Sequence, residues 1–193
     1  MKTFYTVDVG GRLRPGQVLR LQPVAWVATS AIWSREAADT QPPTGTVDAA
    51  RADAMAAQFG AGVTPHGIKI INRRYPEDER KRLAEKVFDD VRRMVAPDAP
   101  SRLQSLFAFD SIDAARAWHR MRLRDSPRAA LVSVEGTNAR RYDMALLGVN
   151  GDSYEEDALR DRARRYWKGE TSRQPCWEWL VPLPVRVLDV LPE

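Results

Sequence analysis

The chain has 193 residues, of which 44% are hydrophobic, and its 30 basic and 26 acidic residues give a formal net charge of +4. This length suits one globular domain whose core needs no disulfide or metal staple. The single cysteine, Cys176, excludes an internal disulfide and a cysteine-rich zinc site, and fits a reducing compartment. The sequence shows no apolar stretch of signal-peptide or membrane-spanning length, so we expect a cytoplasmic protein with no membrane partner.

The first part of the chain alternates between strand signals and breaker signals. Residues 2–9 alternate as a strand does, and residues 17–21 predict a short extended segment. Residues 22–75 are the least regular part and include a proline- and glycine-containing breaker at 64–67. Within them, residues 48–59 are alanine-rich and helical by propensity. We interpret 22–75 as an insertion or covering layer rather than a separate domain.

Helices and strands then follow each other to the end of the chain. Pro76 and the acidic residues after it predict a helix from about residue 77 to 95, because proline and acidic side chains both suit a first helical turn. Within this helix Leu83, Val87, Val91 and Met94 recur at helical spacing. The other predicted elements are strands at 103–109, 129–135, 143–149, 177–181 and 185–190 and helices at 112–122 and 155–167. This mixed order predicts a single α+β domain over residues 1–193, with largely antiparallel or split sheets.

Glu178 is the residue that most strongly suggests chemistry. Strand alternation in residues 176–181 places Glu178 beside Leu180 on one face and three apolar residues on the other. A strand with apolar residues on both faces is covered on both sides, so this carboxylate lies in a partly dry place. Such a group is costly unless it is paired or used. An active-site acid and a buried salt-bridge partner are both consistent with this pattern, and the second is the more common.

The common nucleotide-binding and metal-binding motifs are absent from the sequence. There is no Walker-type phosphate loop and no Gly-x-Gly-x-x-Gly. The two histidines, His66 and His119, have no ligand-like neighbours at metal spacing, so we predict no metal site. Residues 160–173 are rich in arginine, which indicates a solvated helix face or, as an alternative, a surface for phosphate or nucleic acid.

Five motifs spread along the chain form a recognisable pattern. They are Phe4-Tyr5-Thr6-Val7, the run from Pro100 to Ser111 (PSRLQSLFAFDS), Trp118, Tyr166-Trp167-x-Gly169 and Glu178-Trp179-Leu180-Val181. Together they resemble the ADP-ribosyltransferase-like superfamily, in particular a bacterial group of domains of unknown function. The resemblance spans most of the chain but does not include residues 22–75.

The resemblance implies a split pair of small sheets that cradle NAD, which is the substrate. It implies that Glu178 is the catalytic carboxylate, that Ser105 supports the pocket, and that Arg102 meets the pyrophosphate. The residues expected to contact NAD are Tyr5, Thr6, Ser101, Arg102, Ser105 and Phe107. The residue types suit the reaction, because breaking the bond between nicotinamide and ribose builds positive charge that a nearby carboxylate stabilises.

The expected activity is therefore that of an NAD-dependent ADP-ribosyltransferase or an NAD glycohydrolase acting on an unidentified acceptor. Cys176 stands where transferases that modify arginine carry a second glutamate, so the pattern disfavours an arginine acceptor, with Glu170 as a possible substitute. Thr6 stands where such enzymes usually carry arginine or histidine. This difference favours one alternative, an inert binding module of the same fold. A second alternative is an arginine-rich nucleic-acid-binding protein.

Overall fold

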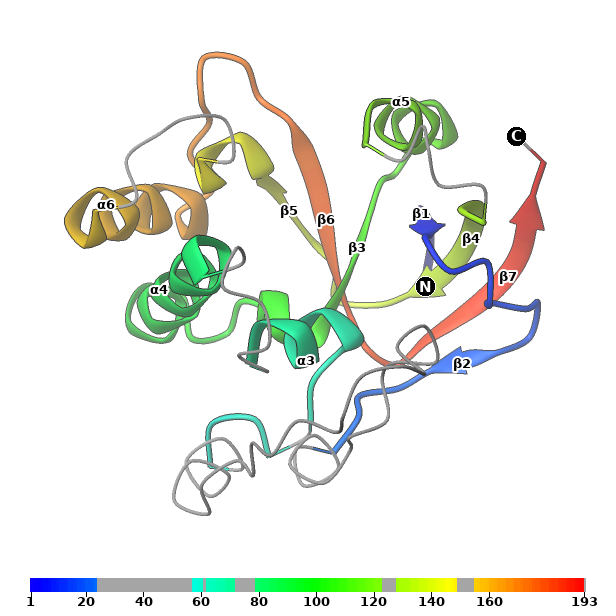
Figure 1. Cartoon of the computed structure of the whole chain (residues 1–193), viewed down its shortest axis with the longest axis horizontal. Coiled ribbons are helices and arrows are strands. Elements are labelled where there is room, and N and C mark those ends of the chain that lie inside the picture. Colours follow the sequence, from blue (N-terminus) through cyan, green and yellow to red (C-terminus); the bar gives the residue numbers. More distant parts are fainter. Residues whose placement is uncertain (24–56, 61, 72–78, 123–127, 149–154, 193) are drawn as a thin grey trace, which may run out of the picture.

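A computed structural model of the chain describes residues 1–23, 57–60, 62–71, 79–122, 128–148 and 155–192 (Figure 1). The strands are β1 (Lys2–Asp8), β2 (Val18–Leu19), β3 (Ser105–Ala108), β4 (Ala130–Gly136), β5 (Arg140–Asp143), β6 (Trp177–Pro182) and β7 (Val185–Leu191). The α-helices are α3 (Pro65–Ile71), α4 (Glu79–Val95), α5 (Ile112–Arg122) and α6 (Glu156–Trp167), with 3-10 helices η2 (Arg102–Gln104) and η3 (Met144–Leu147). The predicted α+β class is confirmed. None of the described helices is long and apolar enough to cross a membrane.

The strands form two small antiparallel sheets. The first has the order β1-β4-β7-β2 and the second the order β3-β6-β5. Main-chain hydrogen bonds between Tyr5 and Phe109, at N–O distances of 2.8 and 2.7 Å, link β1 to the segment that follows β3. The two sheets are therefore held side by side at this edge while each keeps its own strand order.

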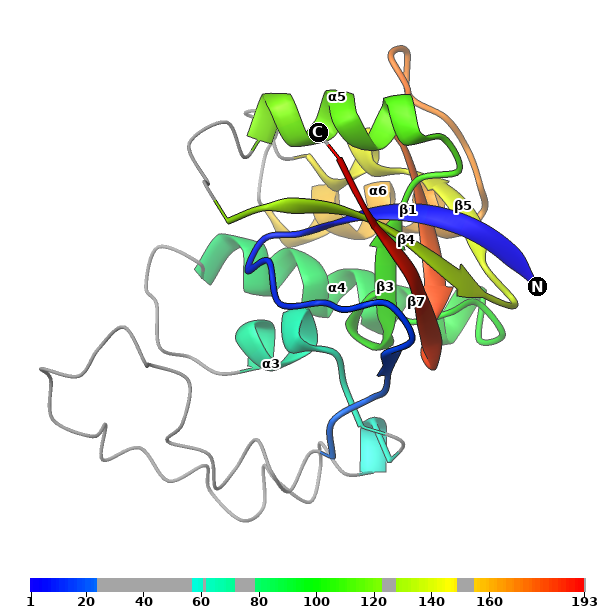
Figure 2. The same ribbon diagram turned by 90° about the vertical axis from the view of Figure 1, so that its right-hand side faces the viewer.

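The second sheet is the middle layer of the molecule. One of its faces packs against the first sheet, where Val181 and Ala108 meet Phe4, Val132 and other buried residues of β4 and β7. Its other face is covered by α4 and α6, as Figures 1 and 2 show. Strand β6 is covered on both faces, so the alternation predicted for it is confirmed and Glu178 faces the helices together with Leu180.

Helix α4 buries one apolar stripe against the second sheet and α6. Its buried apolar residues are Ala84, Val87, Phe88 and Val91, at the i, i+3, i+4, i+7 spacing of one helix face. Leu83 and Met94, which recur at the same helical spacing, are 37% and 63% exposed. Both lie on the flank of a stripe that is centred between Val87 and Phe88.

Two predicted strands are replaced in part by 3-10 helices. Residues 143–149 were expected to form a strand, but β5 ends at Asp143 and η3 follows, because the Asp143 carboxylate accepts a hydrogen bond from Ala145 N at 3.0 Å. In the predicted strand 103–109, η2 occupies the start and is capped by Ser101, whose Oγ accepts from Leu103 N at 3.2 Å. A capping side chain changes the backbone direction locally, and the hydrophobic pattern does not record this.

The breaker predicted at residues 64–67 is the beginning of helix α3. Thr64 Oγ1 accepts a hydrogen bond from Gly67 N at 3.1 Å, and Pro65 occupies the first helical position. These are the helix-start signals of a threonine cap and a first-turn proline. The predicted helix at 48–59, except for its last residues, and most of the predicted insertion at 22–75 lie outside the described residues.

Candidate functional site

A buried cluster of charged side chains lies between the second sheet and helices α3, α4 and α6. Its centre is the guanidinium of Arg102, on η2, which is 5% exposed. Arg102 Nε donates to Glu85 Oε2 at 2.9 Å and Nη2 donates to Glu85 Oε1 at 3.1 Å. The third nitrogen, Nη1, donates to the carboxylate of Glu178 on β6. One arginine therefore joins two carboxylates that come from helix α4 and strand β6.

Tyr166 of α6 completes the inner side of this cluster. Its hydroxyl donates to Glu178 Oε1 at 2.9 Å and accepts from Arg102 Nη1 at 3.0 Å. The ring is fixed by aromatic neighbours, with Tyr142 stacked at 4.6 Å and Phe88 edge-on at 5.5 Å between centroids. The hydroxyl position is thus set by core packing, and Glu178 is held by two donors in a place that is 2% exposed.

His66 forms the outer edge of the cluster. Its Nε2 lies 3.2 Å from Glu85 Oε1, and its side chain is 34% exposed. The ring also meets Phe107 edge-on at 4.9 Å between centroids, and the Arg102 guanidinium lies 4.6 Å from the same phenyl ring. A continuous chain of contacts therefore runs from a half-buried histidine through Glu85 and Arg102 to the fully buried Glu178.

The charges of the cluster are unequal, because one guanidinium faces two carboxylates. Burial alone would raise the pKa of Glu85, but the Arg102 charge and the His66 contact overcome it and lower the pKa to about 2. Burial raises the pKa of Glu178, and the single shared guanidinium does not reverse this. Burial, followed by the nearby Glu178, also raises the pKa of Tyr166 well above its usual value. Glu85 is thus the ionised partner of Arg102 at neutral pH.

Ser101 belongs to a neighbouring network rather than to the Arg102 cluster. Its Oγ donates to Asp89 Oδ1 at 2.7 Å, and Arg92 Nε donates to the same oxygen at 3.0 Å. Arg92 also donates to the carbonyls of Pro97 and Ala99, which tie the end of α4 to the turn before η2. These contacts give Ser101 a structural role at the base of the segment that carries Arg102.

The predicted site residues on β1 lie away from the charged cluster. Thr6 is buried, and its hydroxyl donates to the Phe107 carbonyl at 2.7 Å, so it fastens β1 to β3. Tyr5, on the alternate face of β1, is half-buried and is held by the main-chain bonds to Phe109. The structure therefore brings together Arg102, Phe107 and Glu178 of the predicted set, but places Tyr5 and Thr6 at the junction of the sheets.

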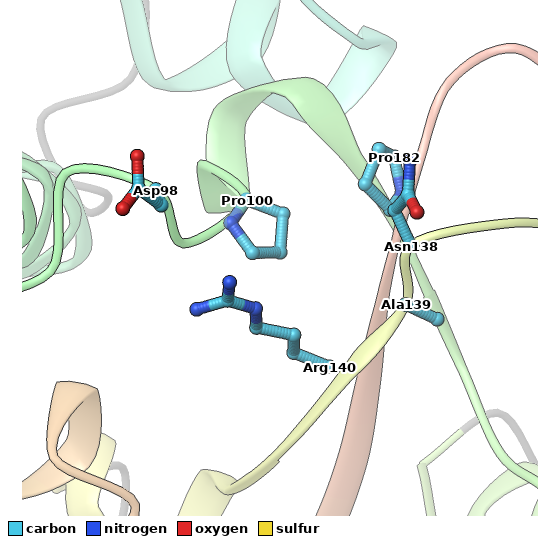
Figure 3. Close-up of a pocket in the computed structure, with 6 residues that line it drawn as sticks. All are labelled: Asp98, Pro100, Asn138, Ala139, Arg140 and Pro182. Atoms are coloured by element: carbon cyan, nitrogen blue, oxygen red, sulfur yellow. The ribbon is translucent and has the colours of Figure 1, made fainter.

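Two shallow pockets lie beside the cluster, around Pro100 and Pro182. The first, of about 340 Å³, is lined by Asp98, Pro100, Asn138, Ala139, Arg140 and Pro182, and Figure 3 shows the Arg140 side chain extending toward Pro100. The second, of about 300 Å³, shares both prolines and is also lined by the predicted residues Ser101 and Ser105. Neither Arg102 nor Glu178 is among the described residues that line these pockets. The pockets and the buried cluster are therefore separate features.

Asp143 orders the loop that leads into β6 and Glu178. Its carboxylate accepts main-chain hydrogen bonds from Ala145 at 3.0 Å, Ser172 at 2.7 Å and Cys176 at 2.8 Å. Burial would raise its pKa, but these donors overcome the effect and lower it. A rigid loop before β6 fixes the start of the strand that carries Glu178.

Replacement of Asp143 with asparagine is therefore expected to destabilise the protein by about 1–3 kcal/mol, because an amide nitrogen would face main-chain donors. Urea denaturation of the variant and of Asp113→Asn, whose side chain is 88% exposed, would measure the difference. Equal stability of the two variants would contradict a loop-ordering role for Asp143.

The arginine-rich segment behaves as a solvated helix face. Arg160 pairs with Glu156 at 2.6 Å, and Arg165 pairs with Glu170 at 3.2 Å, with all four side chains at least one-third exposed. Glu170, the possible substitute for a second catalytic glutamate, is thus an exposed partner of Arg165. Within the described part of the chain, no group of three or more histidine, cysteine or acidic side chains is placed to hold a metal ion.

Two members of the cluster, Glu85 and His66, were not predicted from the sequence. Glu85 follows Ala84 and precedes Phe88 by three residues, so its position beside the buried stripe of α4 was a usable signal. His66 lies just after the threonine cap and proline that begin α3, a pattern that was interpreted as a breaker. No pattern in the sequence links either residue to Arg102.

Comparison with known proteins gives a family but not an activity. No curated protein is similar enough to this chain to match it. The sequence model of DUF2441, described as a protein of unknown function, matches residues 45–193, which include the whole buried cluster. The chain therefore belongs to the DUF2441 family.

Proposed function

We propose that this chain is an ADP-ribosyltransferase-like domain that binds NAD and transfers ADP-ribose to an acceptor or to water, with Glu178 as the catalytic carboxylate. The observation that carries the proposal is the direct contact between Arg102 and Glu178, which are 76 residues apart in the chain. The resemblance assigns these two residues to the pyrophosphate and the ribose of one ligand. Two small antiparallel sheets are compatible with the same architecture.

The cluster offers groups that suit NAD. Arg102 presents a guanidinium, which binds phosphate oxygens through paired hydrogen bonds. Phe107 offers an aromatic ring that is partly exposed, and Glu178 a carboxylate for a ribose hydroxyl and for the positive charge that develops at the ribose. Glu85 keeps its own two hydrogen bonds to Arg102, so the guanidinium stays anchored when Nη1 changes partner.

Binding of NAD would exchange one partner of Arg102 for another. In the structure, Nη1 of Arg102 is occupied by Glu178 and Tyr166. A pyrophosphate oxygen would take the place of Glu178 at this nitrogen, and the carboxylate would turn toward the ribose. Because one charge-assisted hydrogen bond replaces another, the exchange is expected to cost little compared with leaving either charge unpaired.

A second candidate is an inert binding module of the same architecture. The observation that favours it is the burial of Glu178, which is 2% exposed and already bonded to two donors. In this case the ion pair with Arg102 is structural, as buried pairs commonly are.

Nicotinamide release from NAD by the purified chain and by Glu178→Gln distinguishes the two candidates. We expect release by the wild type and a loss of at least about 100-fold in the variant, because an amide stabilises developing positive charge poorly. The variant should remain folded, since glutamine still accepts from Tyr166 and Arg102 keeps Glu85.

Glu156→Gln, which removes a carboxylate that is 58% exposed on helix α6, is the matched control and should retain full release. Parallel reactions with cell lysate as an acceptor source would separate transfer from hydrolysis. No release by the wild type in either reaction would reject the enzyme and support the inert module.

A further inference from the structure

The outer edge of the cluster contains a histidine and a carboxylate in the arrangement of a proton-accepting pair. His66 Nε2 lies 3.2 Å from Glu85 Oε1, and a ring N–H directed at a carboxylate leaves the other ring nitrogen as an acceptor. Glu85 is itself fixed by two hydrogen bonds from Arg102. His66 is one-third exposed, whereas the side chains of Glu85 and Arg102 are 11% and 6% exposed. Within the cluster, this imidazole is the group most open to a molecule that arrives from solvent.

We propose that His66, oriented by Glu85, accepts the proton of an acceptor hydroxyl group during ADP-ribose transfer, an inference that rests on the proposed function. In the proposed complex nicotinamide would stack on Phe107, which meets His66 edge-on and lies against Arg102. The imidazole is therefore next to the place where the reacting ribose would lie, on the solvent side.

The step is balanced without a further reactant. The acceptor oxygen forms a bond to the anomeric carbon of the ribose, the bond from that carbon to the nicotinamide nitrogen breaks, and its electron pair leaves with nicotinamide. The acceptor proton passes to the free ring nitrogen of His66 and then to solvent. Glu178, released from Arg102 Nη1 by the pyrophosphate, turns toward the ribose from the buried side and stabilises the positive charge that develops there.

The pair of His66 and Glu85 suits an acceptor that attacks through an oxygen atom, either water or the hydroxyl group of another molecule. A hydroxyl group is a weak nucleophile at neutral pH, so its attack is accelerated when a base removes its proton during the reaction. Of the described residues, the charged groups that face His66 from the elements packed on α3 are Glu85 of α4 and, behind it, Arg102 of η2. An imidazole acts as a base only in its neutral form, so the rate should fall in acid.

Nicotinamide release by the full chain, measured from pH 5 to pH 8 on the wild type, His66→Gln and His119→Gln, tests this role. One set of reactions contains NAD in buffer alone and the other contains NAD with added cell lysate. Comparing the two sets distinguishes water from another hydroxyl acceptor. We expect His66→Gln to lose about 100-fold in rate and to lose the acid limb of the profile. His119→Gln, on α5, should retain both.

Calorimetric titration with NAD supplies a readout besides activity. NAD affinity should be unchanged in His66→Gln, since His66 acts on the acceptor, and His66→Asn provides a second variant if the first fails to fold. Release by His66→Gln at the wild-type rate and with the wild-type pH profile would overturn this inference alone. No release by the wild type would overturn the proposed function and this inference together.

Discussion

Replacement of Arg102 with methionine is expected to destabilise the protein by about 3–5 kcal/mol. The change removes the one guanidinium that is shared by Glu85 and Glu178 and leaves both carboxylates in place, at 9% and 2% exposure. It also leaves the Tyr166 hydroxyl without one of its two partners. Methionine fills similar apolar volume, so the loss reports the uncompensated charges rather than a cavity.

Chemical denaturation at pH 7 would measure this loss, with Arg160→Met as the control. Arg160 forms an exposed pair with Glu156 one helical turn away, and pairs of this kind contribute less than about 1 kcal/mol. Similar stabilities of the two variants would show that the carboxylates are satisfied by another route. A large difference would identify Arg102 as the residue that makes burial of Glu85 and Glu178 possible.

The sequence predicts most of this fold because most elements show a clear hydrophobic periodicity, either the alternation of a strand or the spacing of one helix face. Strands β1, β6 and β7 and helices α5 and α6 lie within one or two residues of their predicted ranges. Alternation and helical spacing are local properties, and a local pattern is sufficient where tertiary packing agrees with it. The errors fall where one polar side chain redirects the backbone, as Thr64 does at the start of α3 and Asp143 does at the end of β5.

The candidate site was predictable only in part. The pattern in β6 identifies Glu178 as a costly buried carboxylate, and the salt-bridge interpretation of that residue is confirmed by its contact with Arg102. The same pattern does not identify the partner, because Arg102, Glu85 and Tyr166 come from three separate elements and meet only in the folded chain.

The second large effect expected from this structure is a dependence of stability on acid that is carried by Glu85. Its pKa falls from 4.5 to about 2 on folding, because Arg102 and His66 favour the ionised form despite burial. The unfolded chain therefore takes up a proton at this carboxylate first as the pH falls. The stabilisation is complete above pH 4.5, declines between pH 4.5 and 2, and amounts to about 3 kcal/mol at neutral pH.

Glu85→Gln is accordingly expected to be about 3 kcal/mol less stable than the wild type at pH 7 and to approach it as the pH falls through this window. The raised pKa of Glu178 has the opposite sign, and Glu85 is one of its causes, so Glu85→Gln relieves part of that penalty and the measured difference at pH 7 is reduced by this relief. Urea denaturation at several pH values would give the two curves, with Glu156→Gln, 58% exposed, as a control that should follow the wild type. Curves for Glu85→Gln and the wild type that stay parallel from pH 7 to pH 3 would mean that Glu85 is not the ionised anchor of Arg102. Convergence of the two curves would show that the ionised carboxylate of Glu85 holds the Arg102 guanidinium. Glu178 would then be the carboxylate that can give up its contact with Arg102 when NAD binds.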